Sequence, residues 1–443
     1  MDSAAYTSRL AEELAPGILD RLTRYVRIDT QSRRDRTSSP STPGQLELAR
    51  LLAEELHTVG LIDAEVDDNG YVMATLPASP RPPADGVAIG LIAHMDTSPD
   101  APGAGVEPLV HRSYDGGVIR LPRGGTALDP ARMPELADKA GHDIITASGD
   151  TLLGADDKAG VAEVMSAVAH LAAHPELPHP ALRVAFTPDE EIGLGAALFD
   201  LDRFGAACAY TLDGSSLGEL QDESFSALEA ILTIHGVDVH PGQATGKLVS
   251  ALRLAARIVA SLPEDLTPER TAGRDGFIHP FELNATAAQA RIRAILRDFD
   301  EDGLRAHAEL LERTARAIVD SAPGARLELD LHRQYSNMRG YLERVPEVVA
   351  AAEEAIRAEG IEPMRNPIRG GTDGSLLSEM GLPTPNVFTG GHEYHSVREW
   401  ASLQEMAAAA AVAIRLAEVW SRPKYAEVAR SRLTPLRSGI ASS

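Results

Sequence analysis

The sequence holds, at residues 87–93, the continuously apolar run Val87-Ala88-Ile89-Gly90-Leu91-Ile92-Ala93. Asp85-Gly86 bounds the run on one side, and His94-Met95-Asp96 follows it directly. A short apolar run between such boundaries is typical of a strand that is buried on both faces of a parallel sheet. We therefore predict a central strand here, with polar side chains at its carboxyl end.

Helical and strand patterns alternate around this run. Apolar residues at helical spacing predict helices over residues 48–56 and 161–171. Short apolar segments predict strands at residues 182–186 and 210–212. This alternation predicts an α/β fold, in which helices flank a mixed, largely parallel sheet.

The pattern changes after about residue 217. The next elements expected are strands at 225–235, 288–299 and 327–334 and helices at 248–262 and 301–321. The first pattern then resumes, so this α+β block is expected to be an insertion. We predict a main domain over residues 1–217 and 335–443, with an inserted domain over residues 218–334.

Composition excludes several classes of protein. Of the 443 residues, 44% are hydrophobic and 24% charged, as in ordinary folded proteins. The net charge of −23 repels phosphate, so we expect no nucleic acid as a partner. The most apolar stretch near the end, residues 407–413, is shorter than the about 20 residues that span a bilayer, and we expect no membrane partner.

The single cysteine, Cys208, excludes an intrachain disulfide and a zinc site built on cysteines. The start of the chain carries early acidic residues and no long apolar stretch, which is unlike a secretory signal. We therefore expect a cytoplasmic protein.

Five short segments bring acids and histidines to predicted strand ends, loops or a helix start. They are Ala93–Asp96, Leu153–Gly160, Thr187–Gly193, Thr211–Gly214 and Gly390–Ser396. In open α/β sheets the functional site lies outside the carboxyl ends of the strands. Nitrogen and oxygen ligands without thiolate suit zinc, cobalt or manganese, and two ions about 3.5–4 Å apart that share a carboxylate favour hydrolysis.

Three of these segments also have a simpler explanation. His94 alone is more often a histidine that is hydrogen-bonded in a turn, although Asp96 lies on the same strand face and can fix its tautomer. An N-cap with a favourable helix dipole explains one aspartate at residues 156–157 better than two. Three acids at residues 189–191 are a common surface loop, but they can also divide the roles of ligand and general base.

Taken together and in order, these motifs resemble the M20 family of dinuclear zinc peptidases, most closely its peptidase T (tripeptide aminopeptidase) branch. The similarity runs from about Leu19 to Trp420. Other segments that look like this branch are Leu152–Gly160, Phe186–Glu191, Val239–Gly242, Ile295–Asp300 and Arg369–Gly374.

The resemblance implies two Zn²⁺ ions per subunit, with Co²⁺ or Mn²⁺ as substitutes. Asp156 would bridge the ions, and a cis peptide would follow it. His94 and Asp213 would complete one site, whereas Glu191 and His395 would complete the other.

Two of these ligands have a neighbouring competitor. We choose Asp156 over Asp157 because the family's bridging acid lies two places before a lysine. We choose His395 over His392 because Tyr394-His395 matches the branch better.

The remaining roles concern catalysis and substrate. The resemblance implies that Asp96 orients the first imidazole and that Glu190 is the general base. The inserted block would be a lid, from which His240 could donate to the developing oxyanion. Arg369 could bind a peptide's terminal carboxylate bidentately. A histidine in a Pro-Gly turn and a surface arginine beside a turn are the simpler alternatives.

The implied activity is a metal-dependent aminopeptidase that removes the N-terminal residue of short peptides, in particular tripeptides. An M20-type carboxypeptidase or dipeptidase, an N-acyl amino acid deacylase and a non-catalytic binding member are the alternatives. Residues 396–400 depart from the tripeptidase pattern. Because related lids often pair across a two-fold axis, a homodimer is also expected.

Overall fold

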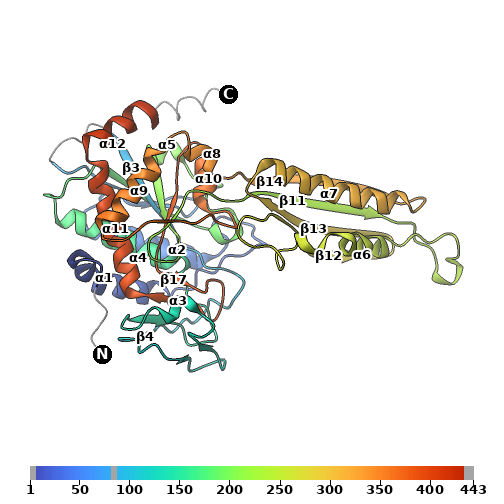
Figure 1. The fold of residues 1–443 in the computed structure, drawn as a ribbon, viewed down its shortest axis with the longest axis horizontal. Coiled ribbons are helices and arrows are strands. Elements are labelled where there is room, and N and C mark those ends of the chain that lie inside the picture. The colour runs from blue at the N-terminus through green and yellow to red at the C-terminus, as the bar shows by residue number, and fades with distance from the viewer. Residues whose placement is uncertain (1–5, 81–86, 434–443) are drawn as a thin grey trace. The chain divides into compact units, whose positions relative to one another are not determined.

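The computed structural model describes residues 6–80 and 87–433. The chain forms two compact units. Unit 1 contains residues 1–222, 338–366 and 372–443, and unit 2 contains residues 223–337 and 367–371 (Figure 1). Among the described residues, no helix is both long and apolar enough to cross a membrane.

Unit 1 is built on an eight-stranded mixed sheet. The strands across the sheet are, in order, β1 (Glu65–Val66), β2 (Val72–Leu76), β8 (Ala181–Thr187), β3 (Ala88–His94), β9 (Cys208–Leu212), β16 (Asn386–Val387), β10 (Glu219–Gln221) and β15 (Met364–Arg365). Strand β3 lies in the middle and runs parallel to both of its neighbours, β8 and β9. The predicted α/β class with a mixed, largely parallel sheet is confirmed.

Strand β3 is buried along nearly its whole length, as its apolar sequence predicts. Its close packing depends on Gly90, because a Cβ at this position would lie 2.7 Å from the Cβ of Ala209 and from ring atoms of Phe204. On the same strand, Ile92 packs in a cluster with Phe204 and with Leu377. The strand is therefore held from the side by a neighbouring strand and from the face by helices.

Three long helices of unit 1 pack against one another: α1 (Arg9–Tyr25), α4 (Ala155–Ala173) and α11 (Leu403–Trp420) (Figure 1). Helix α11 is almost entirely buried, and its alanines at residues 407–411 allow its neighbours to approach closely. The other helices of this unit are α2 (Pro43–Thr58), α3 (Pro134–Ala137), α5 (Leu201–Phe204), α8 (Arg339–Leu342), α9 (Glu347–Ala358), α10 (Asp373–Glu379) and α12 (Pro423–Val428).

Two smaller sheets complete unit 1. One contains, in order, β17 (Gly391–His392), β18 (Trp400–Ser402), β7 (Ile144–Thr146) and β4 (Leu109–His111). The other pairs β5 (Ile119–Arg120) with β6 (Ala127–Leu128). Strands this short carry too little periodicity to be predicted from sequence.

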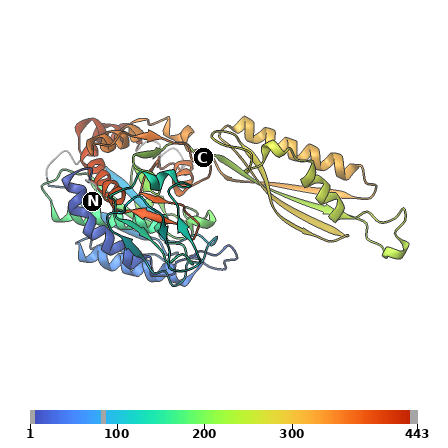
Figure 2. The ribbon, with the colours of Figure 1, turned by 60° about the horizontal axis from the view of Figure 1, so that its bottom comes forward.

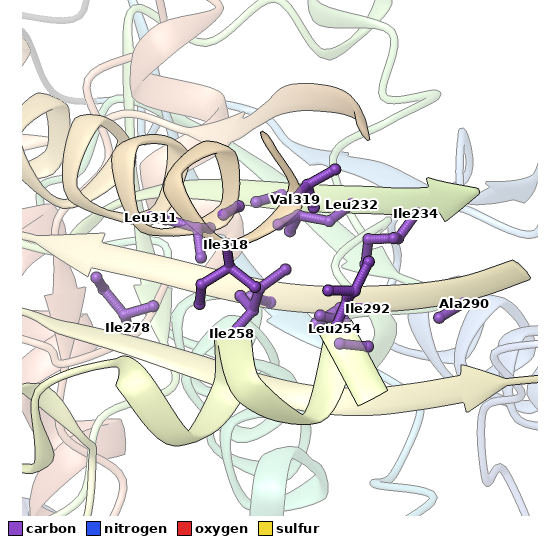
Figure 3. Close-up of a cluster of buried hydrophobic side chains, with 14 of the residues drawn as sticks. Leu232, Ile234, Leu254, Ile258, Ile278, Ala290, Ile292, Leu311, Ile318 and Val319 are labelled. Atoms are coloured by element: carbon purple, nitrogen blue, oxygen red, sulfur yellow. The ribbon is translucent and has the colours of Figure 1, made fainter. Parts of the chain in front are cut away.

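Unit 2 has a four-stranded antiparallel sheet. Its strands are, in order, β12 (Phe277–Ala285), β13 (Gln289–Asp298), β11 (Ser226–His235) and β14 (Arg326–Tyr335). Helices α6 (Ala251–Ser261) and α7 (Glu301–Asp320) contact each other and the sheet (Figure 2). Leu254 and Ile258 of α6 and Leu311 of α7 form one apolar core with the strands (Figure 3).

The inserted block differs from our prediction in its number of strands. Strand β12 was not predicted, and the block reads β-α-β-β-α-β. Pro280 within this segment argues against a central strand. Here the proline is tolerated because β12 is an edge strand, with an irregular register between Pro280 and Glu282.

The boundaries of the two units also differ in detail from the expected ones. Residues 219–221, which we expected in the insertion, form β10 of the large sheet. Residues 367–371 belong to unit 2, where Ile368 forms a bridge with Ser224.

Candidate metal centre

The candidate ligands gather at the carboxyl ends of three parallel strands. His94 is the last residue of β3, Asp213 directly follows β9, and the acidic segment 189–191 follows β8. Because these strands are parallel neighbours, their carboxyl ends meet at one edge of the sheet. Asp156, at the start of α4, and His395, in the loop after β17, join them.

The carboxylate of Asp156 lies between two imidazoles. Its Oδ1 is 3.0 Å from Nε2 of His94, and its Oδ2 is 3.3 Å from Nε2 of His395. Each imidazole also faces a second carboxylate: His94 Nε2 lies 3.6 Å from Asp213 Oδ1, and His395 Nε2 lies 2.9 Å from Glu191 Oε2. The five side chains thus form two adjoining sets of candidate ligands that share one aspartate.

The neighbouring Asp157 has a different environment, although its carboxylate is also close enough to His94 and Asp213 to form a candidate metal group. Its Oδ2 accepts the backbone N–H of His94, and its Oδ1 accepts that of Gly160. Both oxygens are therefore used in holding the backbone. We favour Asp156 as the shared ligand because its oxygens face imidazoles. The Asp156-Asp157 peptide is cis, as the resemblance implied.

The competing histidine lies outside the cluster. His392 is buried, stacks on Trp400 with ring centroids 4.0 Å apart, and pairs its Nε2 with Glu405 Oε2 at 3.0 Å. Glu405 also pairs with Lys139 at 2.6 Å. This pairing gives His392 a structural environment, whereas His395 faces two carboxylates of the cluster.

Asp96 connects the two halves of the site through hydrogen bonds. Its Oδ1 and Oδ2 accept the backbone N–H groups of Glu190 and Glu191, respectively. Its backbone carbonyl lies 3.1 Å from Nδ1 of His94. A donor at Nδ1 leaves Nε2 of that imidazole free to bind a metal ion.

The acids of the cluster need a positive charge near them. Burial, together with the nearby charge of Asp156, raises the pKa of Glu191 to about 8. Burial likewise raises the pKa of Asp213. Within residues 6–80 and 87–433, Oε1 of Glu191 has no hydrogen-bond partner. An unpartnered buried carboxylate oxygen beside imidazole nitrogens fits the oxygen and nitrogen ligand set of a divalent transition metal.

Burial has the opposite effect on the pKa of an imidazole, because the charged form of an imidazole is the protonated one. Burial alone lowers the pKa of His395, but the carboxylates of Asp156 and Glu191 raise it to about 11. Burial alone raises the pKa of Asp156, but contact with His395 and His94 lowers it below its usual value. In the absence of metal, protons on the imidazoles thus supply the charge that cations can provide.

Glu190 precedes the candidate ligand Glu191 in the short helix Glu190–Ile192. Burial, together with the negative charges of Asp213 and Asp373, raises its pKa well above the usual value. A carboxylate with a raised pKa beside a metal cluster is suited to accept and release a proton.

Two buried acids near the site were not singled out from the sequence. Asp189 accepts hydrogen bonds from the backbone N–H of Ser41 and from Nε2 of Gln45, which holds the start of α2 against the acidic loop. Asp373, the first residue of α10, accepts from Thr187 Oγ1 at 2.6 Å, and burial raises its pKa to about 7. Its place in the motif at residues 369–374 was the signal available for it.

The predicted substrate residues both belong to unit 2. His240 is exposed, and its Nδ1 accepts the backbone N–H of Gly242 at 3.2 Å. The guanidinium of Arg369 donates from Nη1 to the carbonyls of Gly273 and Asp275, at 2.9 and 2.8 Å. Its Nη2 donates to Oγ1 of Thr271 at 2.9 Å, so three of the five N–H donors of the guanidinium are used within unit 2 and the others remain for a ligand.

The comparisons with known proteins agree with this geometry. A profile described as peptidase family M20/M25/M40 matches residues 152–419. A protein named Peptidase T from Bacillus velezensis is 47% identical over 404 residues, which cover 91% of this chain and 98% of that protein. Peptidase T from Bacillus subtilis is 46% identical over 402 residues, which cover 90% and 98% of the two chains.

Solved structures support the fold. The crystal structure of the aminopeptidase PepT from Bacillus cereus superposes with a TM-score of 0.71 at 23% identity and covers 92% of this chain and 99% of that one. A tripeptidase from Staphylococcus aureus superposes with a TM-score of 0.70 at 19% identity, with coverage of 92% and 99%. The chain therefore belongs to the peptidase family M20/M25/M40 and is a metallopeptidase.

Proposed function

We propose that this protein is an aminopeptidase that removes the N-terminal residue of short peptides, in particular tripeptides, with two Zn²⁺ ions. The observation that carries the proposal is the carboxylate of Asp156 between the imidazoles of His94 and His395. The Peptidase T relatives support the substrate class. Co²⁺ and Mn²⁺ are expected substitutes, since the ligands are nitrogen and oxygen atoms.

The residues divide into two ligand sets. His94, Asp156 and Asp213 would hold one ion, and Asp156, Glu191 and His395 the other. Bound zinc supplies Lewis acidity, which polarises a carbonyl group and acidifies water. The oxygen of a water molecule forms the new bond to the scissile carbonyl carbon, and the carbon–nitrogen bond breaks.

The protons pass through Glu190. Its carboxylate accepts one proton from the attacking water and delivers one to the departing amine. Burial favours this role, because a carboxylate with a raised pKa is a stronger base than an exposed one. Asp96 orients the imidazole of His94 through its backbone carbonyl and holds the loop of Glu190 through its carboxylate.

The two residues of unit 2 would act on the substrate. His240 would donate to the oxygen that becomes negative, and Arg369 would bind the terminal carboxylate of the peptide. We expect Arg369→Ala to raise KM for a free tripeptide about tenfold or more, which corresponds to the loss of about 1.4 kcal/mol. A tripeptide amide lacks the carboxylate, so its KM should not change. Equal effects on both substrates would contradict the assignment.

One set of substrates tests the proposed reaction. A free tripeptide, its N-acetylated form and a dipeptide are incubated with the zinc-loaded protein, and the products are identified by mass spectrometry. An aminopeptidase releases the first residue of the free tripeptide and leaves the acetylated form intact. Preference for the acetylated form would favour a deacylase, and release of the last residue would favour a carboxypeptidase. Elemental analysis that finds no metal would favour a non-catalytic member.

A homodimer and a cytoplasmic location stay predictions. Light scattering of the purified chain tests the first, because a homodimer has twice the 47.1 kDa of the chain. Cell fractionation tests the second.

A further inference from the structure

Glu399 lies shortly after His395 in sequence, and its residue is only 1% exposed. Its carboxylate accepts three backbone N–H groups from the segment that carries the shared aspartate. Oε2 accepts from Leu153 and Gly154, both at 2.8 Å, and Oε1 accepts from Asp156 at 3.0 Å. One buried side chain thus joins the loop of one imidazole to the loop of the shared carboxylate.

The loop before α4 needs such an acceptor. Gly154 has a left-handed backbone with φ +82°, and Asp156 has φ −85° and ψ 102°, which are not helical values. The first N–H groups of a helix have no partner within the helix and must find another acceptor. A carboxylate accepts several hydrogen bonds, and its negative charge is favourable at a helix N-terminus.

We propose that Glu399 is a positioning residue of the metal centre. It holds the backbone at Asp156 so that the two carboxylate oxygens of that residue face His94 and His395. In the described part of the chain, no hydrogen bond or ion pair joins Glu399 to His94 or His395, so its effect on the metals passes through the backbone of Asp156. The inference rests on the proposed metal ligands.

The test uses the isosteric variant Glu399→Gln. Its amide nitrogen is a donor and must face at least one backbone N–H, which loses its acceptor. We expect the affinity for Zn²⁺, measured by competition with a chelator, to fall about 10- to 100-fold, as for other groups that orient metal ligands. The visible absorption of the Co²⁺-loaded variant should also differ from that of the wild type, because the ligand geometry changes.

Glu359→Gln is the matched control. Glu359 is also 1% exposed, and its carboxylate accepts from the hydroxyls of Thr7 and Ser8. Glu359→Gln also removes the charge that pairs with Nε of Arg415 at 3.5 Å, so both variants should lower the melting temperature. Only Glu399→Gln should change zinc affinity and the Co²⁺ spectrum. Unchanged values in Glu399→Gln, or equal changes in the two variants, would overturn the inference.

Hydrogen exchange covers the case in which Glu399→Gln does not fold. In the metal-free wild type, the amides of Leu153, Gly154 and Asp156 should exchange slowly because Glu399 accepts from them. Fast exchange at these amides would contradict the inference. If the wild type binds no metal, the proposed function fails first. If it binds two ions and both variants bind them equally well, only the role of Glu399 fails.

Discussion

The two imidazoles of the metal cluster have very different surroundings. The side chain of His94 is 3% exposed and ends the central strand β3, whereas that of His395 is 42% exposed and comes from a loop. The acid behind His94, Asp96, is fully buried. The acid near Nδ1 of His395 is Asp100, which is 52% exposed and lies 3.6 Å away. One side of the cluster is thus built into the sheet, and the other is more open to water.

This difference indicates different roles for the two sides. Exposed charges are screened by water, so the contact with Asp100 contributes little energy. Asp100 also pairs with Arg34 at 3.2 Å, which competes for the same carboxylate. We infer that the His94 side fixes the geometry of the centre, and that the His395 side binds its ion less tightly.

The largest effect is expected from the residue that both sides share. Asp156→Asn removes the negative charge between the imidazoles, and the two ligand sets lose their common carboxylate. We expect both metal ions to be lost and the activity to fall to background. Elemental analysis and the tripeptide assay measure this. A variant that keeps two ions per chain would show that Asp156 is not the shared ligand.

Replacing Glu190, the proposed general base, should leave metal binding intact and reduce catalysis. Glu190→Ala should keep both ions and lower kcat about 10²- to 10⁴-fold, because no ligand is removed but the general base is lost. Metal content and kcat are measured on the same preparation. Full activity, or loss of the metals, would contradict the separate roles of Glu190 and Glu191.

Replacing the acid beside each imidazole should lower zinc affinity to different extents. Asp96→Asn should lower zinc affinity about 10- to 100-fold, because the buried carboxylate of Asp96 accepts the backbone N–H groups of Glu190 and Glu191 and its Oδ1 lies 3.4 Å from Nδ1 of His94. Asp100→Asn should change it less than about threefold, because its contact is long and exposed. Chelator competition on both variants compares them directly. Equal losses would remove the distinction between the two sides.

The same distinction predicts the order in which metal leaves. A chelator should remove one ion quickly from the His395 side and the other slowly from the His94 side. The metal content of the wild type should therefore fall in two phases. In His395→Ala the fast phase should be missing, and in His94→Ala the slow one. The reverse pattern would assign the tightly bound ion to the other side.

A separate effect concerns how the stability of the buried side depends on pH. In the metal-free protein, burial raises the pKa of Asp373 from 3.8 to about 7. Between these values the folded state keeps a proton that the unfolded state has released, so the free energy of unfolding falls as the pH rises. Asp373→Asn, which cannot ionise, should show a smaller fall. Urea unfolding near pH 4 and near pH 7 measures the difference, and identical slopes would contradict it.

Much of the fold could be predicted because its signals are local. The apolar run at residues 87–93 predicted β3, and acids and histidines after short apolar segments predicted where a site would form. Strand β12 was missed because Pro280 contradicts a central strand, and only the tertiary structure shows that this strand lies at an edge.

The hydrogen bonds that position the site residues could not be predicted from residue types. Glu399 binds backbone N–H groups, which every residue except proline carries, so no sequence pattern shows its partners. By residue type alone the adjacent aspartates likewise look equivalent, and only the resemblance to the family favoured Asp156. Only the coordinates show that Asp157 binds the backbone, whereas Asp156 faces the imidazoles.

Anomalous diffraction from crystals of the zinc-loaded protein tests the central claim most directly. The account predicts two zinc peaks about 3.5–4 Å apart, with one oxygen of Asp156 on each. The peak on the Oδ1 side should lie beside His94, and the peak on the Oδ2 side beside His395. A single peak, or two peaks that do not share Asp156, would contradict it.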